Sequence, residues 1–136
     1  MADDLAARFS FARLIVRDLE QQAAFYRSAF GYGEGIRIRA QVDGRPIEEL
    51  IFLAPDGKVE LMLLAFDGGP PPSPTGVHIG FYTHDLDAVQ ARILAAGGRV
   101  AQPIGPLDVP GMSRFAFYAD PEGYWLEILE RDGARA

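Results

Sequence analysis

The chain has 136 residues, of which 49% are hydrophobic, so it is long enough to bury one core. A net charge of −6 without any basic cluster excludes nucleic acid and anionic membrane surfaces as expected partners. The absence of cysteine excludes disulfides, thiolate metal sites and cysteine nucleophiles. The acidic start is not a signal peptide and no apolar run is long enough to span a bilayer, so we expect a cytoplasmic protein.

A strand and a helix are predicted near the N-terminus. Residues 9–16 are apolar apart from Ser10 and Arg13 and fit a strand with a period of two. Asp18 follows at an N-cap position, where its carboxylate can accept from the free amides of the first helical turn. Apolar residues then recur at helical spacing over 19–30, and Gly31 is expected to end the helix in the left-handed conformation.

Only strands are predicted between residues 36 and 66. Two Asp-Gly turn signals separate three strand-like runs, which are residues 36–42, 47–54 and 58–66. The first module therefore has the order βαβββ and spans residues 7–66. Residues 67–75 contain four prolines, cannot continue a sheet and are interpreted as a linker.

The second half of the chain repeats this order over residues 76–131. A strand at 78–83 leads into a helix at about 85–96, which Gly97 and Gly98 end. The strands and connections that follow are predicted as a strand at 99–102, a loop at 103–111 that is a candidate lid, a strand at 113–119, a turn at 120–123 and a strand at 124–129. This second βαβββ module shares a single structural domain with the first.

A constant offset of 67 residues superposes the two modules. The offset matches the helix caps Asp18 and Asp85 and the helix-ending Gly31 and Gly98. It also matches two positions on strands, as Phe11 falls on His78 and Glu60 falls on Glu127. Agreement of caps, helix ends and strand positions together indicates an internal repeat.

The alternation of side chains along these strands predicts a shared cavity. One face of the first strand of each module carries Phe11, Arg13 and Ile15, or His78, Gly80 and Tyr82. Glu60 and Glu127 lie in the last strands, each between two apolar residues. An unpaired buried carboxylate costs roughly several kcal/mol, so each must be compensated by a cationic side chain or by a metal ion.

Three motifs at this point resemble the vicinal oxygen chelate superfamily, which includes glyoxalase I, extradiol dioxygenases and bleomycin-resistance proteins. They are Leu14-Ile15-Val16-Arg17-Asp18-Leu19 with Phe25-Tyr26, His78-Ile79-Gly80-Phe81 with Asp85-Leu86, and Asp120-Pro121-Glu122-Gly123-Tyr124-Trp125-Leu126-Glu127. The resemblance covers nearly the whole chain. It implies an α+β, glyoxalase-like fold in which two βαβββ modules form an open eight-stranded cup around a divalent metal.

The resemblance also implies a set of ligands. The glyoxalase-like pattern takes one ligand from the first and last strands of each module, which here are Phe11, Glu60, His78 and Glu127. Phenylalanine cannot bind a metal, so this sequence departs from the four-ligand pattern at Phe11. His78, Glu127 and Glu60 would leave a three-ligand nitrogen/oxygen site for Zn, Mn, Fe, Ni or Mg.

Two alternatives to a metal remain open. His78 and Glu127 would also form a buried ion pair without any metal. Arg13 points into the same cup, where it would either neutralise Glu60 or Glu127 or grip an anionic substrate. Tyr82 and Arg114 are further candidates for contact with substrate.

The resemblance favours a metal-dependent lyase or isomerase, such as a lactoylglutathione lyase, acting on a small oxygenated substrate. The metal would hold two neighbouring substrate oxygens and stabilise an enolate-like intermediate, with Glu60 or Glu127 as the proton-shuttling base. One alternative is a metal-free drug- or metabolite-binding protein of the bleomycin-resistance type. Another is an extradiol-type dioxygenase, which is disfavoured because its first histidine would fall at Phe11. By analogy with the family we expect a homodimer.

Overall fold

The computed structural model describes residues 12–42, 45–68 and 77–133. The described residues form eight strands and two helices in the order βαβββ–βαβββ. The elements of the first half are β1 (Ala12–Ile15), α1 (Leu19–Phe30), β2 (Ile36–Val42), β3 (Arg45–Leu53) and β4 (Val59–Phe66). Those of the second half are β5 (His78–Thr83), α2 (Leu86–Ala95), β6 (Arg99–Pro106), β7 (Met112–Ala119) and β8 (Trp125–Arg131).

The strands form two sheets with the same topology. The strand order is β1-β4-β3-β2 in the first sheet and β5-β8-β7-β6 in the second. In each sheet the first and last strands of the module pair in parallel and all other neighbours are antiparallel. The predicted α+β fold of two βαβββ modules is confirmed, and the two sheets are separate four-stranded sheets across the described part of the chain.

Helix α1 has the bounds that its capping residues predict. Asp18 has an extended backbone and its carboxylate accepts from the backbone N–H of Gln21 at 3.0 Å. Gly31 ends the helix with φ at +83°, and its N–H donates to the carbonyl of Arg27. Neither helix in the described ranges is long and apolar enough to cross a membrane.

Helix α2 ends slightly earlier than the repeat predicts. It stops at Ala95, and the left-handed residue after it is Gly97, with φ at +101°, rather than Gly98. Gly98 is needed for a different reason, because a Cβ atom there would lie 2.6 Å from Ile93 and 3.0 Å from the ring of Phe25. The two glycines that superpose in the sequence, Gly31 and Gly98, therefore have different structural roles.

The second strand of the second module is longer than expected. The sequence predicts a strand over 99–102 and a loop over 103–111, but β6 continues to Pro106, so the connection to β7 covers only residues 107–111. Two register shifts against β7 allow the strand to continue through Pro103. Because β6 is at the edge of the sheet, a missing amide donor there does not interrupt a central ladder.

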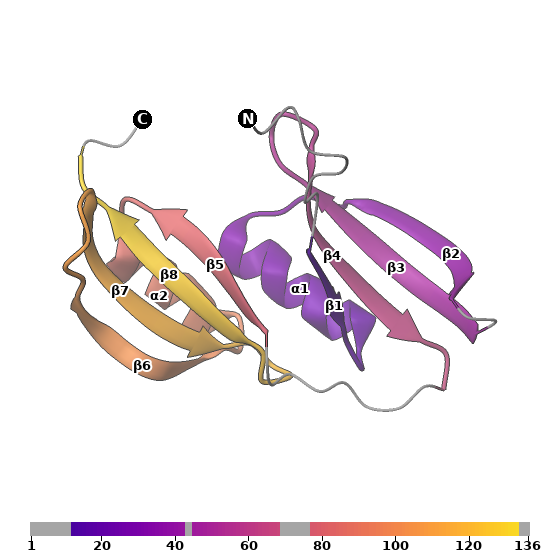
Figure 1. Cartoon of the computed structure of the whole chain (residues 1–136). Helices are drawn as coiled ribbons and strands as arrows, with labels where there is room; N and C mark the ends of the chain where they lie inside the picture. Colours follow the sequence, from indigo (N-terminus) through magenta and orange to yellow (C-terminus); the bar gives the residue numbers. More distant parts are fainter. Residues whose placement is uncertain (1–11, 43–44, 69–76, 134–136) are drawn as a thin grey trace.

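One hydrophobic core joins the two modules. It contains the buried side chains of α1, Leu61 and Leu63 from β4, Leu86 and Ile93 from α2, and the helix-facing residues of β7 and β8. The two helices contact each other, and Figure 1 shows α1 between the two sheets. Each sheet therefore buries one face against the helices and turns its other face outward.

The turn at residues 120–124, which we call the inter-module turn, fixes the second module to α1. The buried carboxylate of Asp120 accepts from the Gln22 side chain at 2.7 Å and from the Tyr26 hydroxyl at 2.8 Å. The carboxylate of Glu122 accepts from the backbone N–H groups of Arg17 and Asp18, each at 2.7 Å, just before the helix begins. These bonds satisfy helix-terminal amides and buried donors, so they hold the two modules in one arrangement.

A second carboxylate network holds α2 on its own sheet. Glu130 accepts from the first amide of the helix, that of Leu86, at 2.8 Å and from the guanidinium of Arg114 at 2.7 Å and 2.9 Å. These hydrogen bonds lower the pKa of Glu130 to about 2, and the bond from Arg114 contributes most to the shift. Burial acts in the opposite direction.

We expect Asp120→Ala to lower the free energy of unfolding by about 2–4 kcal/mol, because the change leaves the donors of Gln22 and Tyr26 buried without an acceptor. Urea unfolding followed by circular dichroism measures this loss. Tyr26→Phe removes one of the two donors together with its bond and is expected to cost about 1 kcal/mol. An unchanged urea midpoint for Asp120→Ala would show that the inter-module turn does not hold the modules together.

We expect Glu130→Gln to destabilise the protein at neutral pH and to have progressively less effect in acid. The folded-state pKa of Glu130 lies below its ordinary value, so its stabilisation is complete above about pH 4.5 and is lost as the pH falls towards 2. Urea midpoints of parent and variant between pH 7 and pH 2 should therefore converge. Asp87→Asn, which removes only the exposed partner of Arg114, is expected to cost about 0.5 kcal/mol or less. A difference independent of pH would contradict this role for Glu130.

Candidate functional site

The outward face of the second sheet, which we call the second open face, brings His78 and Glu127 together. The parallel register pairs His78 with Trp125 and Gly80 with Glu127, so all four positions lie on one side of the sheet. The intervening residues Leu126 and Ile128 point into the core and are fully buried. His78 is exposed and Glu127 is half-buried. The sharing of one face by His78 and Glu127 follows from this register.

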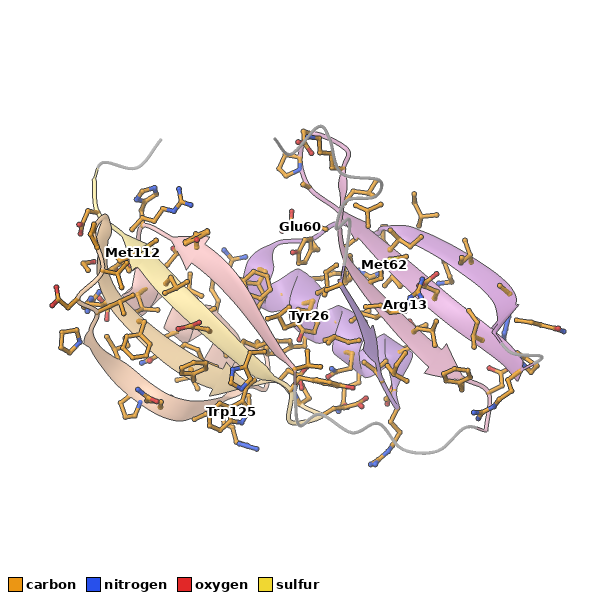
Figure 2. The ribbon with its side chains drawn as sticks, in the orientation of Figure 1. Arg13, Tyr26, Glu60, Met62, Met112 and Trp125 are labelled. Carbon is orange, nitrogen blue, oxygen red and sulfur yellow. The ribbon has the colours of Figure 1, made fainter. Side chains whose placement is uncertain are left out.

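Aromatic rings surround these two residues. The His78 ring stacks on Trp125, with 5.6 Å between the centroids and 15° between the planes, and meets the edge of Phe117 at 5.3 Å. Phe115 lies 6.1 Å from Phe117 along the same strand. We call His78, Phe115, Phe117 and Trp125 the aromatic cluster. Its Trp125 is 39% exposed and lies on the lower edge of the second sheet in Figure 2, so the cluster offers a ring surface to a ligand.

Glu60 lies elsewhere. Phe52 pairs with Leu61 and Leu53 pairs with Val59, which makes Glu60 the extra residue of a β-bulge on β4. Its carboxylate accepts from the hydroxyl of Tyr32 at 2.8 Å. Burial, followed by this hydrogen bond, raises the pKa of Tyr32, so the phenol remains a proton donor.

Arg13 lies on the outward face of the first sheet, which we call the first open face. Its Nε donates to the buried carboxylate of Glu49 at 2.6 Å. Figure 2 shows Arg13 and Met62 close together on this sheet, in agreement with their pairing in the register. The carboxylate that Arg13 meets is thus Glu49, which the sequence analysis did not single out although it also interrupts an apolar strand.

The two other predicted substrate contacts have different surroundings. Arg114 donates to Glu130 and Asp87 and therefore sits on the helix side of its sheet, away from the aromatic cluster. Tyr82 lies on the second open face, is 58% exposed, and carries the guanidinium of Arg131 at 3.8 Å above its ring. Of these two residues, only Tyr82 shares a face with His78.

The predicted metal ligands do not meet within one chain. No group of three or more His, Asp or Glu side chains in the described ranges stands close enough to hold an ion. His78 and Glu127 share a face, whereas Glu60 lies on the other sheet, and Phe11 is outside the described residues. Among the described residues, two of the predicted nitrogen/oxygen ligands share a face, one fewer than a typical catalytic metal site uses.

The two open faces point away from each other. Alternate residues of β1 and β4 enter the shared core, while Arg13, Ile15 and Met62 are on the opposite face. The same alternation in β5 and β8 directs His78 and Glu127 away from that core. A cup lined by both open faces therefore cannot close within this one chain.

Sequence reasoning missed Phe115 and Phe117 as members of the site. Their signal was present, because the run Phe115-Ala116-Phe117-Tyr118 alternates between outward and core positions. Trp125 and Glu127 share a face only if β8 is a regular strand. The unbroken register of β8 with β5 shows that they do.

Comparison with known proteins identifies the family. The model of the Glyoxalase/Bleomycin resistance protein/Dioxygenase superfamily matches residues 8–128. Lactoylglutathione lyase GLX1 of Arabidopsis thaliana is 27% identical over 127 residues, which are 91% of this chain and 44% of that protein. A Mycobacterium tuberculosis protein provisionally named a glyoxylase is 38% identical over 60 residues, 44% of this chain and 22% of that protein. This chain therefore spans less than half the length of these two relatives.

A solved structure has the same architecture. A glyoxalase family protein from Bacillus cereus superposes with a TM-score of 0.77 at 17% identity, over 98% of this chain and 99% of that one. At this identity the likeness establishes the fold alone. The match of the family model over most of the sequence establishes more: the chain belongs to the Glyoxalase/Bleomycin resistance protein/Dioxygenase superfamily.

Proposed function

We propose that the chain is a metal-dependent lyase or isomerase of the glyoxalase type that acts on a small oxygenated substrate at the second open face. The observation that carries the proposal is the placement of His78 and Glu127 on one accessible face, at positions that match the ligand pattern of the family. Relatives named lactoylglutathione lyase support the lyase class. The expected cytoplasmic location is part of the same proposal.

A second copy of the chain completes the site in this proposal. The two open faces point away from each other, so the second open face of one copy would meet the first open face of another, where Met62 and Leu64 are already buried within one chain. A two-fold dimer of this kind would form two equivalent cups. Glu60 would then reach the site only from the second copy, in exchange for its hydrogen bond to Tyr32.

The residues of the second open face would divide the work. A divalent ion of Zn, Mn, Fe, Ni or Mg bound by His78 and Glu127 would supply Lewis acidity to substrate oxygens. The carboxylate of Glu127, or Glu60 of a second copy, would take a proton from the substrate carbon and return it. The aromatic cluster would bind the apolar part of the substrate and exclude water from one side of it. The exposed hydroxyl of Tyr82 would contact a substrate oxygen.

A metal-free binding protein of the bleomycin-resistance type is the second candidate. It is favoured by the aromatic cluster, whose exposed rings suit a flat ligand, and by the two ligands of one chain, which fall short of a complete metal site. In that case His78 would act as a member of the ring surface, since its imidazole already stacks on Trp125.

We expect protein purified without chelator to contain about one divalent ion per chain, and His78→Ala to lose it, because the change removes the single nitrogen ligand of the proposed site. Elemental analysis measures the content. His84 is the matched control: it is the other histidine, it is exposed, and its ring contacts the carbonyl of Arg131. His84→Ala should keep the metal, and a parent protein without metal would leave only the binding protein.

We expect Glu127→Gln to lower turnover of the hemithioacetal of methylglyoxal and glutathione by about 100-fold or more, because the amide can neither accept a proton nor bind a metal as the carboxylate does. Formation of the thioester, followed by its absorbance, measures the rate. Asp87→Asn is the control, because it removes a carboxylate from the exposed start of α2. Absence of turnover in a metal-containing parent would exclude the lactoylglutathione reaction while leaving other lyase substrates.

We expect co-expressed His78→Ala and Glu60→Gln chains to regain about a quarter of the parent metal content, because random pairing makes half of the dimers mixed and each mixed dimer has one intact site. Each variant expressed alone should contain little metal. Metal content of the mixed preparation no higher than that of the separate variants would contradict a site shared between two copies.

A further inference from the structure

A cavity of about 490 Å³ lies between the two modules, and Tyr82 is the residue of the second open face that reaches its wall. Its wall is built from the end of α1 with the residues that follow it, the end of β5, the bulge of β4 and one face of α2. None of the four members of the aromatic cluster lines it. Its volume falls within the range of about 300 to 1,000 Å³ that small-molecule sites occupy.

A cation without an acidic partner lines this cavity. Arg92 projects from α2, and a guanidinium nitrogen of Arg92 reaches the carbonyl of Ser28 at 3.4 Å, at the long end of the hydrogen-bond range. Across the described part of the chain, no carboxylate lies within ion-pair distance of this guanidinium. Most of its five N–H groups are therefore available to an anion.

A carboxylate without a cationic partner lines the same cavity. One oxygen of Glu60 accepts from Tyr32, and within the described ranges no Lys or Arg is within ion-pair distance of either oxygen. The two opposite charges are held at different parts of the wall. Arg92 lies 3.4 Å from the position that a Cβ of Gly31 would take, whereas Glu60 meets the far end of the next side chain, the hydroxyl of Tyr32.

The rest of the wall is largely apolar and well ordered by packing. Phe30 and Phe81 stack with 4.1 Å between centroids and 10° between planes, and Tyr32 stacks on Phe52 at 4.7 Å. Val89 and Ile128 contribute aliphatic surface. A ligand that fits this wall has an apolar middle, a cationic end for Glu60 and an anionic end for Arg92.

We propose that this cavity is a second binding site, for a zwitterionic peptide of about two residues with an apolar side chain. The carboxylate of the peptide binds the Arg92 guanidinium and its ammonium group binds Glu60 beside Tyr32. A dipeptide carries its two charges at opposite ends, in keeping with the placement of Arg92 and Glu60 at different parts of the wall. The site involves neither His78 nor Glu127, so peptide binding does not require the proposed metal, but it shares Glu60 and Tyr82 with the proposed lyase site and needs Glu60 in its observed position beside Tyr32.

Titration of the ¹⁵N-labelled protein with glycyl-L-phenylalanine tests the proposal. We expect shifts of the amide signals of Gly31, Gly33 and Thr83, which line the cavity, and none at Gly80 on the second open face. The same peptide with an amidated C-terminus, and the peptide with an acetylated N-terminus, should each bind about tenfold more weakly, because each loses one charged contact. Free phenylalanine should bind more weakly than the dipeptide.

Arg92→Gln should weaken binding of the zwitterionic dipeptide by about tenfold and leave binding of the amidated peptide unchanged. A purely structural role of Arg92 would affect both peptides. Glu60→Gln should weaken binding of the zwitterionic dipeptide by about tenfold and leave binding of the acetylated peptide unchanged. His78→Ala is the matched control and should bind all three peptides as the parent does, even if it loses metal. Equal binding of the blocked and free peptides, shifts confined to the second open face, or no shifts at all would overturn the proposal. The amide spectrum of each variant shows whether it is folded.

Discussion

Two carboxylates in one turn determine how the halves of this molecule are placed. Asp120 supplies the acceptor for two buried donors of α1, and Glu122 accepts from the amides that precede the same helix. The turn belongs to the second module and the helix to the first. Since a buried donor without an acceptor is costly, neither module reaches its observed packing without the other. The hydrophobic core then continues across the junction without a break.

The position of this junction has consequences for binding. Because the helices occupy the space between the sheets, the second face of each sheet points away from this shared core. The surface that carries His78 and Glu127 therefore resembles half of a cup, and the half that carries Arg13 is on the other side of the molecule. The hollow that one chain does enclose lies at the junction itself, beside the end of α1.

The fold was largely predictable because its signals are local. Caps and apolar periodicity predicted both bounds of α1, and the alternation along β5 and β8 predicted which of their residues share a face. The site was predictable only in part. The outward placement of His78 and Glu127 follows from simple alternation, but the redirection of Glu60 depends on a bulge between β3 and β4. A bulge is decided by pairing between strands, which no single stretch of sequence reveals.

The unequal roles of Gly31 and Gly98 concern the history of the chain. If the two modules descend from one duplicated ancestor, they inherited a glycine at the same place after the helix. In the first copy the residue now provides a left-handed backbone, and in the second it provides room for the ring of Phe25 from the first copy. The contact with Phe25 exists only when both modules are present, whereas the closer approach to Ile93, at 2.6 Å, arises within the second module. Equivalent glycines of the repeat thus meet different constraints, one set by backbone conformation and the other by side-chain packing.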